Sequence, residues 1–405
     1  MTPARAMHRR ITLAIAMAAL LSGTVPARAA ENCTASEAVT NYGSRFDPGL
    51  DMSKDQPVLK PTSGYSPAEA SLAKFKFVLA TDAPGSWRLT LYDKSFHVVA
   101  NLTPEDFRAT AGRAQWTGIL PGDITAILDG AGDSAVAIRI ETVIIYPPQS
   151  KDIRYFSTQH AVPAWRDLYH AKDVLARRMG ASVGMIYGSA DTADGTTVNW
   201  VCSGVMVSAD TMLTNNHCGA PPGIVAWSDQ VRDNMVVDLS RDDRVGVRQQ
   251  YGVAEILTNS APLDYALLRL KSVAGGSQFT GVPVYQSLAT VAPTVPAAHL
   301  FVIHHARGLP KLLTADCDAD PGSPGNGASP DELAHKCDTE PGASGAPLFD
   351  ETGRLVALHH RGFPRDATCK TVGPKLNYAI LMSRIIADLQ HSSKAIAARL
   401  GVPAP

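Results

Sequence analysis

The chain has 405 residues, of which 45% are hydrophobic and 19% are charged, and its formal net charge is −1. This length predicts two or three domains with ordinary buried cores. The balanced charge excludes the basic excess typical of nucleic-acid binding, so we expect no nucleic-acid partner. It also excludes the acidic excess typical of disorder, and the functional class must therefore come from motifs.

Residues 1–30 are predicted to form a secretory signal peptide. Arg9 and Arg10 precede an apolar run over residues 11–21, and a small-x-small pattern follows at residues 27–29. The apolar run is too short to span a bilayer comfortably. An ordinary N-terminal helix would not explain all three features together. We therefore expect export to the periplasm or the extracellular medium, with no membrane contact after the signal is removed.

Six cysteines follow the signal: Cys33, Cys202, Cys218, Cys317, Cys337 and Cys369. An even number in an oxidising compartment predicts three disulfides, although six cysteines allow fifteen pairings. A cysteine metal site normally contains close pairs such as C-x-x-C, and the sequence has none. We expect neither a metal nor a cofactor.

Residues 31–148 are predicted to form a small β-sandwich-like domain or barrel. Short strand-like runs are separated by turn residues, and the last of them alternates before it becomes continuously apolar. These runs cover residues 76–80, 87–92, 97–100 and 135–146. The pair Pro147-Pro148 ends the unit.

Residues 149–179 are predicted to be a connector that contains a helix-like stretch over residues 165–178. A second β-rich domain is expected over residues 180–405, because many short strand-like runs alternate with glycine and proline. Apolar residues at helical spacing predict an amphipathic helix over residues 383–400.

Three motifs in this second domain suggest nucleophilic catalysis. His217 lies in Thr-Asn-Asn-His-Cys, Asp264 begins Asp-Tyr-Ala-Leu-Leu, and Ser344 lies in Gly-Ala-Ser-Gly. A serine hydroxyl needs a base, which the histidine supplies, and the base needs a carboxylate that orients its ring. The backbone N–H groups of Gly342 and Ser344 would stabilise the oxyanion.

Other interpretations of these residues exist. A single histidine is more often structural than catalytic, and the pairs His304-His305 and His359-His360 resemble metal ligands as well as strand residues beside a cleft. The chain could also be a protease-like binding protein without turnover, or a serine esterase. The chain order of the three motifs and the β-rich pattern do not fit an α/β-hydrolase esterase with its G-x-S-x-G elbow.

The motifs resemble those of trypsin-like serine proteases, and the chain is most similar to bacterial lysyl endopeptidases. The resemblance rests on residues 202–207, 214–218, 264–268, 302–305 and 339–347, and on similarity to that family's pro-region at residues 89–92 and 115–123. It implies a mainly β fold, a chymotrypsin-like double β-barrel with the active site between the barrels. It also implies an endopeptidase that acts on protein or peptide substrates, and we expect the protein to be a monomer.

The same resemblance implies pairings of Cys202 with Cys218, Cys317 with Cys337, and Cys33 with Cys369. Ala343 stands where trypsin and chymotrypsin carry the aspartate that binds the amine released on activation. Zymogen activation through that ion pair is therefore excluded. The N-terminal domain is expected to assist folding or to mask the cleft.

The residues that select the substrate are ambiguous in the sequence. Asp338 lies six residues before Ser344, where trypsin has the carboxylate that binds arginine or lysine. However, Thr339 and His359 match positions at which glutamyl endopeptidases recognise an acidic side chain, and the adjacent His360 is a further pocket candidate. The aspartate that reads lysine in lysyl endopeptidases has no counterpart here. We expect an acidic preference rather than a basic one.

Overall fold

The structure is a computed structural model of the whole chain. It describes residues 42–404 except 63–70, 81–85, 109–113, 131–135, 147–159, 161, 220–223, 243–247, 277, 292–298, 321–327 and 364–372. The expected signal peptide, Cys33 and Cys369 lie outside the described residues. No helix in the described part of the chain is both long and apolar enough to cross a membrane.

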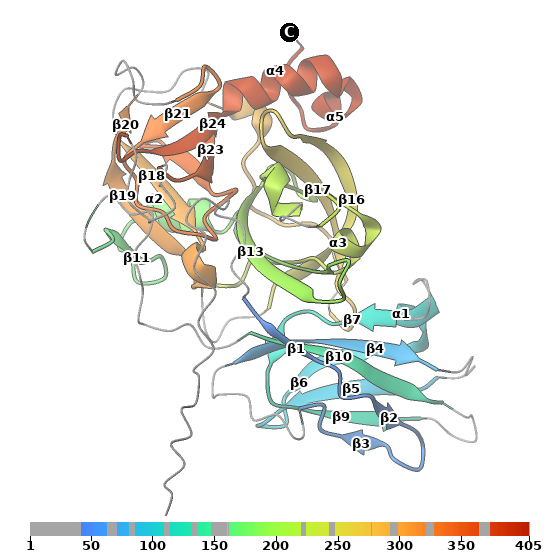
Figure 1. Cartoon of the computed structure of the whole chain (residues 1–405). Coiled ribbons are helices and arrows are strands. Elements are labelled where there is room, and N and C mark those ends of the chain that lie inside the picture. The colour runs from blue at the N-terminus through green and yellow to red at the C-terminus, as the bar shows by residue number, and fades with distance from the viewer. Residues whose placement is uncertain are drawn as a thin grey trace, which may run out of the picture.

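The N-terminal unit consists of two antiparallel sheets that share one core (Figure 1). The first sheet contains β1 (Ser44–Phe46), β2 (Leu50–Met52), β4 (Leu72–Leu79), β7 (Ala114–Trp116), β8 (Leu120–Pro121) and β10 (Ile138–Tyr146). The second contains β3 (Val58–Leu59), β5 (Arg88–Asp93), β6 (Val98–Leu102) and β9 (Ile124–Asp129), and the short helix α1 (Pro104–Arg108) follows β6. This is the sandwich-like arrangement expected from the sequence.

Strand β10 explains why its sequence pattern changes along its length. Successive side chains of a strand point to opposite faces. Val143 and Ile145 pack into the sandwich core, whereas Ile144 and Tyr146 pack against the next unit of the chain. The second half of β10 is therefore buried on both faces, and its sequence is continuously apolar for that reason.

The next unit is a closed six-stranded barrel. Its strands, in barrel order, are β12 (Val183–Asp191), β13 (Thr197–Met206), β14 (Thr211–Thr214), β17 (Tyr265–Ser272), β16 (Gln250–Ser260) and β15 (Val236–Asp238). Helix α3 (Asp229–Asp233) precedes β15. Trp200 fills the barrel interior, and its ring lies so close to Gly188 that a Cβ there would be 2.1 Å from the indole.

An eight-stranded antiparallel sheet forms the second half of this double-barrel architecture. Its order is β11 (Trp165–Asp167), β19 (Leu312–Cys317), β18 (Leu300–His304), β22 (Pro347–Asp350), β23 (Leu355–Arg361), β24 (Asn377–Leu381), β21 (Glu332–His335) and β20 (Ala319–Asp320). The expected mainly β, chymotrypsin-like double β-barrel after a sandwich-like unit is confirmed.

Helices close the ends of the second sheet. The expected helix over residues 165–178 is wrong in its first part, because Trp165–Asp167 pairs with β19 as a strand and only α2 (Val174–Gly180) is helical. The C-terminal helix is present as α4 (Met382–Ser392) and α5 (Lys394–Arg399). Ile385 and Leu389 of α4 are fully buried in the core that the two halves share.

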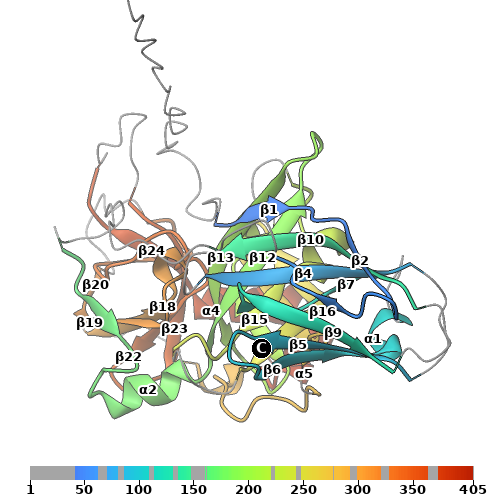
Figure 2. The ribbon, with the colours of Figure 1, turned by 90° about the horizontal axis from the view of Figure 1, so that it is seen from below.

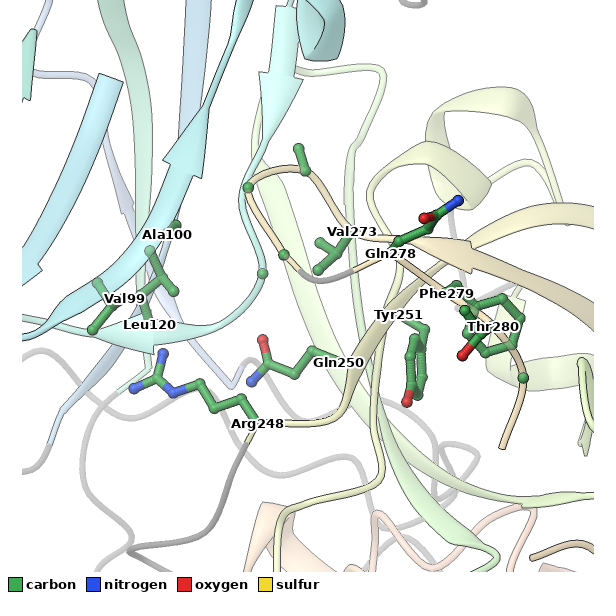
Figure 3. Close-up of a pocket in the computed structure, with 15 residues that line it drawn as sticks. Val99, Ala100, Leu120, Arg248, Gln250, Tyr251, Val273, Gln278, Phe279 and Thr280 are labelled. Atoms are coloured by element: carbon green, nitrogen blue, oxygen red, sulfur yellow. The ribbon is translucent and has the colours of Figure 1, made fainter. Parts of the chain in front are cut away.

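The N-terminal unit packs directly on the closed barrel (Figure 2). The side-chain amide of Gln250 accepts a hydrogen bond from the Ile119 N–H at 2.8 Å and donates to the Ile119 carbonyl at 3.1 Å. Lys74 is completely buried there and donates to the carbonyl of Asn234. Figure 3 shows a pocket at this junction, lined from both units by residues that include Ala100, Arg248 and Gln250.

Candidate active site

His217 and Asp264 meet because two paired strands bring them to the same end of the barrel. Strand β14 pairs antiparallel with β17, with Thr214 opposite Ala266. His217 lies just after β14, in the 3-10 turn η2 (Asn216–Gly219), and Asp264 lies just before β17. The antiparallel register therefore places the two residues next to each other.

The geometry of this pair fixes the histidine ring. The Nδ1 atom of His217 lies 2.7 Å from Oδ2 of Asp264, and the His217 backbone N–H donates to Oδ1 at 2.9 Å. Asp264 adopts a positive φ of 41°, a region in which Asp is tolerated, and Asn215 holds its carbonyl at 2.8 Å. Since Nδ1 must donate to the carboxylate, Nε2 is left as the basic nitrogen.

The carboxylate is held in its charged form. Burial alone would raise the pKa of Asp264, but the charge and hydrogen bonds of His217, with a further hydrogen bond from His360, outweigh burial and hold the pKa well below its usual range. An ionised carboxylate at this position stabilises a protonated imidazole.

A disulfide anchors the histidine turn. Cys218, the residue after His217, is bonded to Cys202 of β13. The second disulfide joins Cys317 to Cys337 and so fixes the chain before Asp338. Both are pairings that the family resemblance implies; the pairing expected for Cys33 with Cys369 lies outside the described residues.

Ser344 lies on a loop from the second sheet that packs against the histidine turn. Its carbonyl accepts a hydrogen bond from the Ser203 N–H at 2.8 Å and lies 3.8 Å from the Cys218 sulfur. Its Oγ is buried. The Ser344 hydroxyl and Nε2 of His217 are both without a hydrogen-bond partner among the described residues.

Two glycines give the loop its shape. Gly342 has φ of +101°, and a Cβ there would lie 2.6 Å from the His305 carbonyl. Gly345 has φ of +83°, and a Cβ there would lie 2.2 Å from the Ser203 carbonyl. Only glycine fits such positions without a backbone shift. Among the described residues, the N–H groups of Gly342 and Ser344 donate to no backbone carbonyl, which leaves them available to an oxyanion.

The carboxylate of Asp338 already has hydrogen-bond partners within the chain. Its Oδ2 accepts a hydrogen bond from the Ala164 N–H at 2.7 Å and lies 2.8 Å from Nδ1 of His160. Its side chain is fully buried. The candidate carboxylate for basic substrates thus binds the segment that leads into β11.

The neighbouring candidates differ from Asp338. Thr339 is fully buried, and its hydroxyl has no hydrogen-bond partner among the described residues. His359 is also buried, with Nδ1 at 3.2 Å from Nε2 of His335. His304 lies nearby, and burial, reinforced by the charge of His359, lowers the pKa of His304 to about 3.

Sequence reasoning proposed His360 as a pocket candidate but did not foresee its contacts, nor the role of Ser203. His360 contacts Asp264 rather than the other pocket candidates, and it also contacts Glu332. Ser203 donates from Oγ to the Gly342 carbonyl at 2.9 Å. No motif signals either role, because both depend on strands that are distant in sequence.

The described residues contain one close group of side chains of metal-ligand type, Cys202, His217 and Cys218. Both of its sulfurs are joined in a disulfide, so neither is a thiolate that could bind a metal. The group does not fit a metal site.

Residues 202–358 match a protein-family model. That family is the trypsin-like peptidase domain. The matched segment begins at Cys202 and contains His217, Asp264 and Ser344. The match supports a trypsin-like peptidase, whereas neither lysyl nor glutamyl specificity follows from it.

Solved structures of the Rv3671c protease from M. tuberculosis are similar to the chain. The active form has 16% identity and a TM-score of 0.38, covering 64% of this chain and 95% of that one. An inactive mutant form has 16% identity and a TM-score of 0.37, covering 60% and 98%. No curated protein sequence matches the chain.

Proposed function

We propose that the chain is an exported serine endopeptidase that uses His217, Asp264 and Ser344. The observation that carries the proposal is the 2.7 Å contact between His217 Nδ1 and Asp264, together with the unpaired Nε2 of His217 and Oγ of Ser344. The trypsin-like family match and the two disulfides support a hydrolase of an oxidising compartment.

In the proposed reaction, Ser344 Oγ attacks the peptide carbonyl as His217 Nε2 takes its proton. Asp264 keeps the other ring nitrogen protonated and stabilises the imidazolium. The N–H groups of Gly342 and Ser344 bind the oxyanion, and one such donor typically contributes about 3 kcal/mol to the transition state. His217 then gives the proton to the leaving amine, which leaves an acyl-enzyme that water hydrolyses.

We propose that the enzyme prefers an acidic residue before the scissile bond. Asp338 would have to lose its contacts with Ala164 and His160 before it could bind a basic side chain. The Thr339 hydroxyl, in contrast, is free to donate to a carboxylate, and the buried imidazole of His359 lies in β23. An unpaired buried donor such as this hydroxyl favours the substrate that satisfies it.

The N-terminal unit is proposed to assist folding of the catalytic part. Its hydrogen bonds to residues such as Gln250, Asn234 and Asn199 fall on the closed barrel, and Tyr42 also lies beside Gly308 of the second half; none of these is a triad residue. These contacts favour a folding role over direct coverage of the triad.

Cleavage of a proteome-derived peptide library by the purified protein tests both activity and specificity. We expect cleavage after Glu or Asp, and none by Ser344→Ala. Cleavage after Lys or Arg would overturn the acidic preference while leaving the endopeptidase proposal intact. A folded protein that cleaves no peptide would contradict the endopeptidase proposal.

A further inference from the structure

His360 lies between two carboxylates behind the triad. Its Nδ1 is 3.3 Å from Oδ2 of Asp264, and its Nε2 is 2.7 Å from Oε1 of Glu332. The three side chains are largely buried, with exposures of 12% for His360, 17% for Asp264 and 6% for Glu332. His360 lies in β23, Glu332 lies in β21, and Asp264 directly precedes β17. The contacts of His360 with the two carboxylates therefore depend on the assembled fold.

Both carboxylates are surrounded by donors and are therefore ionised. Glu332 also accepts from Arg361 Nε and NH2 at 2.8 and 2.9 Å, and from the Ser329 N–H at 2.7 Å. Burial alone would raise the pKa of Glu332, but hydrogen bonds from His360 and Arg361 hold it well below its usual range. An ionised carboxylate can only accept hydrogen bonds.

The ring between them must therefore donate from both nitrogens, which only an imidazolium does. Burial alone would lower the pKa of His360, but its hydrogen bonds to Asp264 and Glu332 outweigh burial and raise it. Other titratable groups near this cluster include Arg361, which stacks on the Tyr378 ring at 3.6 Å. They also include His335 and His359; burial, together with the charges of His359 and His360, lowers the pKa of His335.

We propose that Glu332 keeps His360 protonated beside Asp264, and that the positive charge of His360 lets His217 act as a base at lower pH. The inference rests on the proposed function, because it concerns the pH at which the same triad works. His360 is a positioning residue, since it reaches the base only through Asp264.

The electrostatic reason is direct. The cation of His360 offsets part of the negative charge of Asp264 that would otherwise favour protonated His217. Without it, His217 would keep its proton to higher pH, and the acid limb of the activity profile would move upward. Nδ1 of His217 and Nδ1 of His360 lie 2.7 and 3.3 Å from the same Asp264 oxygen, so they are at most about 6 Å apart. Unit charges at roughly this separation and an effective dielectric of roughly 20 to 40 predict a displacement of about one to two pH units.

The test measures the rate of fluorophosphonate labelling of Ser344 against pH, because this probe needs no knowledge of the preferred substrate. The variants are His360→Gln and Glu332→Gln in the full exported chain, with His391→Gln on the exposed face of α4 as the matched loss of a histidine. We expect the acid limb to rise by about one to two pH units in His360→Gln, by a smaller amount in Glu332→Gln, and not at all in His391→Gln.

Nuclear magnetic resonance of ¹⁵N-histidine-labelled wild-type protein tests the same inference without catalysis or folding of a variant. We expect both ring nitrogens of His360 to carry protons at pH 7. A neutral His360 ring at pH 7 would overturn the inference, as would an acid limb that stays at the wild-type position in either folded variant. Wild-type protein that is never labelled would instead contradict the proposed function, and the ring protonation would still decide the inference.

Discussion

Replacement of Gly345 by alanine is the perturbation whose effect the structure specifies most sharply. The new Cβ would lie 2.2 Å from the Ser203 carbonyl and 2.5 Å from Thr214 Oγ1, at a φ of +83°. The left-handed conformation costs about 1 to 2 kcal/mol for alanine, and the overlap adds about 1 to 3 kcal/mol. We expect a loss of about 2 to 5 kcal/mol in the free energy of unfolding, and a large loss of Ser344 reactivity because the adjacent backbone must shift.

Gly195 supplies the matched control. Its φ is +81°, nearly the same, but a Cβ there would meet no atom within 4 Å. Gly195→Ala should therefore cost only about 1 kcal/mol and leave Ser344 reactivity unchanged. Urea unfolding gives the stability of both variants, and fluorophosphonate labelling gives their reactivity. Equal stability losses with unchanged labelling of Gly345→Ala would refute the steric reasoning.

Three further predictions concern stability. Replacing both Cys202 and Cys218 by serine should lower the free energy of unfolding by about 3 kcal/mol, measured by urea unfolding; no change would show that the loop is held by packing alone. His304 and His335 are held neutral, with lowered pKa values, so the unfolded chain binds more protons than the folded one. Stability should then fall by about 1 kcal/mol per pH unit for each of them as pH drops below about 6.5, and a flat profile down to pH 4 would contradict this. Gln250→Ala should cost about 1 to 3 kcal/mol and speed proteolytic release of the N-terminal unit, whereas unchanged proteolysis would show that the apolar contacts alone hold it.

The sequence identified the residues that each carry a local signal. His217, Asp264 and Ser344 lie in short motifs whose chain order is informative, and the structure brings the first two within hydrogen-bond distance. Alternation and turn residues likewise predicted the β-rich units, because burial of one face imposes a period of two. The sequence predicted that the apolar second half of β10 is a strand, but it did not indicate that this half contacts the barrel.

The sequence could not supply contacts that depend on strand order. Glu332 and His360 lie on β21 and β23, which both neighbour β24, and only the assembled sheet brings them together. The hydrogen bond from the Ala164 N–H, just before β11, to Asp338 is another such contact. Trp165–Asp167 was expected to be helical because its own residues are compatible with a helix, whereas pairing with β19 decides its conformation.

Covalent labelling of Ser344 tests the central claim most directly. The folded, exported protein should react with a fluorophosphonate, and mass spectrometry should place a single adduct on Ser344. His217→Ala should abolish the reaction, and Asp264→Asn should slow it strongly because the ring tautomer is no longer fixed. An adduct elsewhere, or labelling of Ser344 at an unchanged rate in His217→Ala, would contradict a triad mechanism.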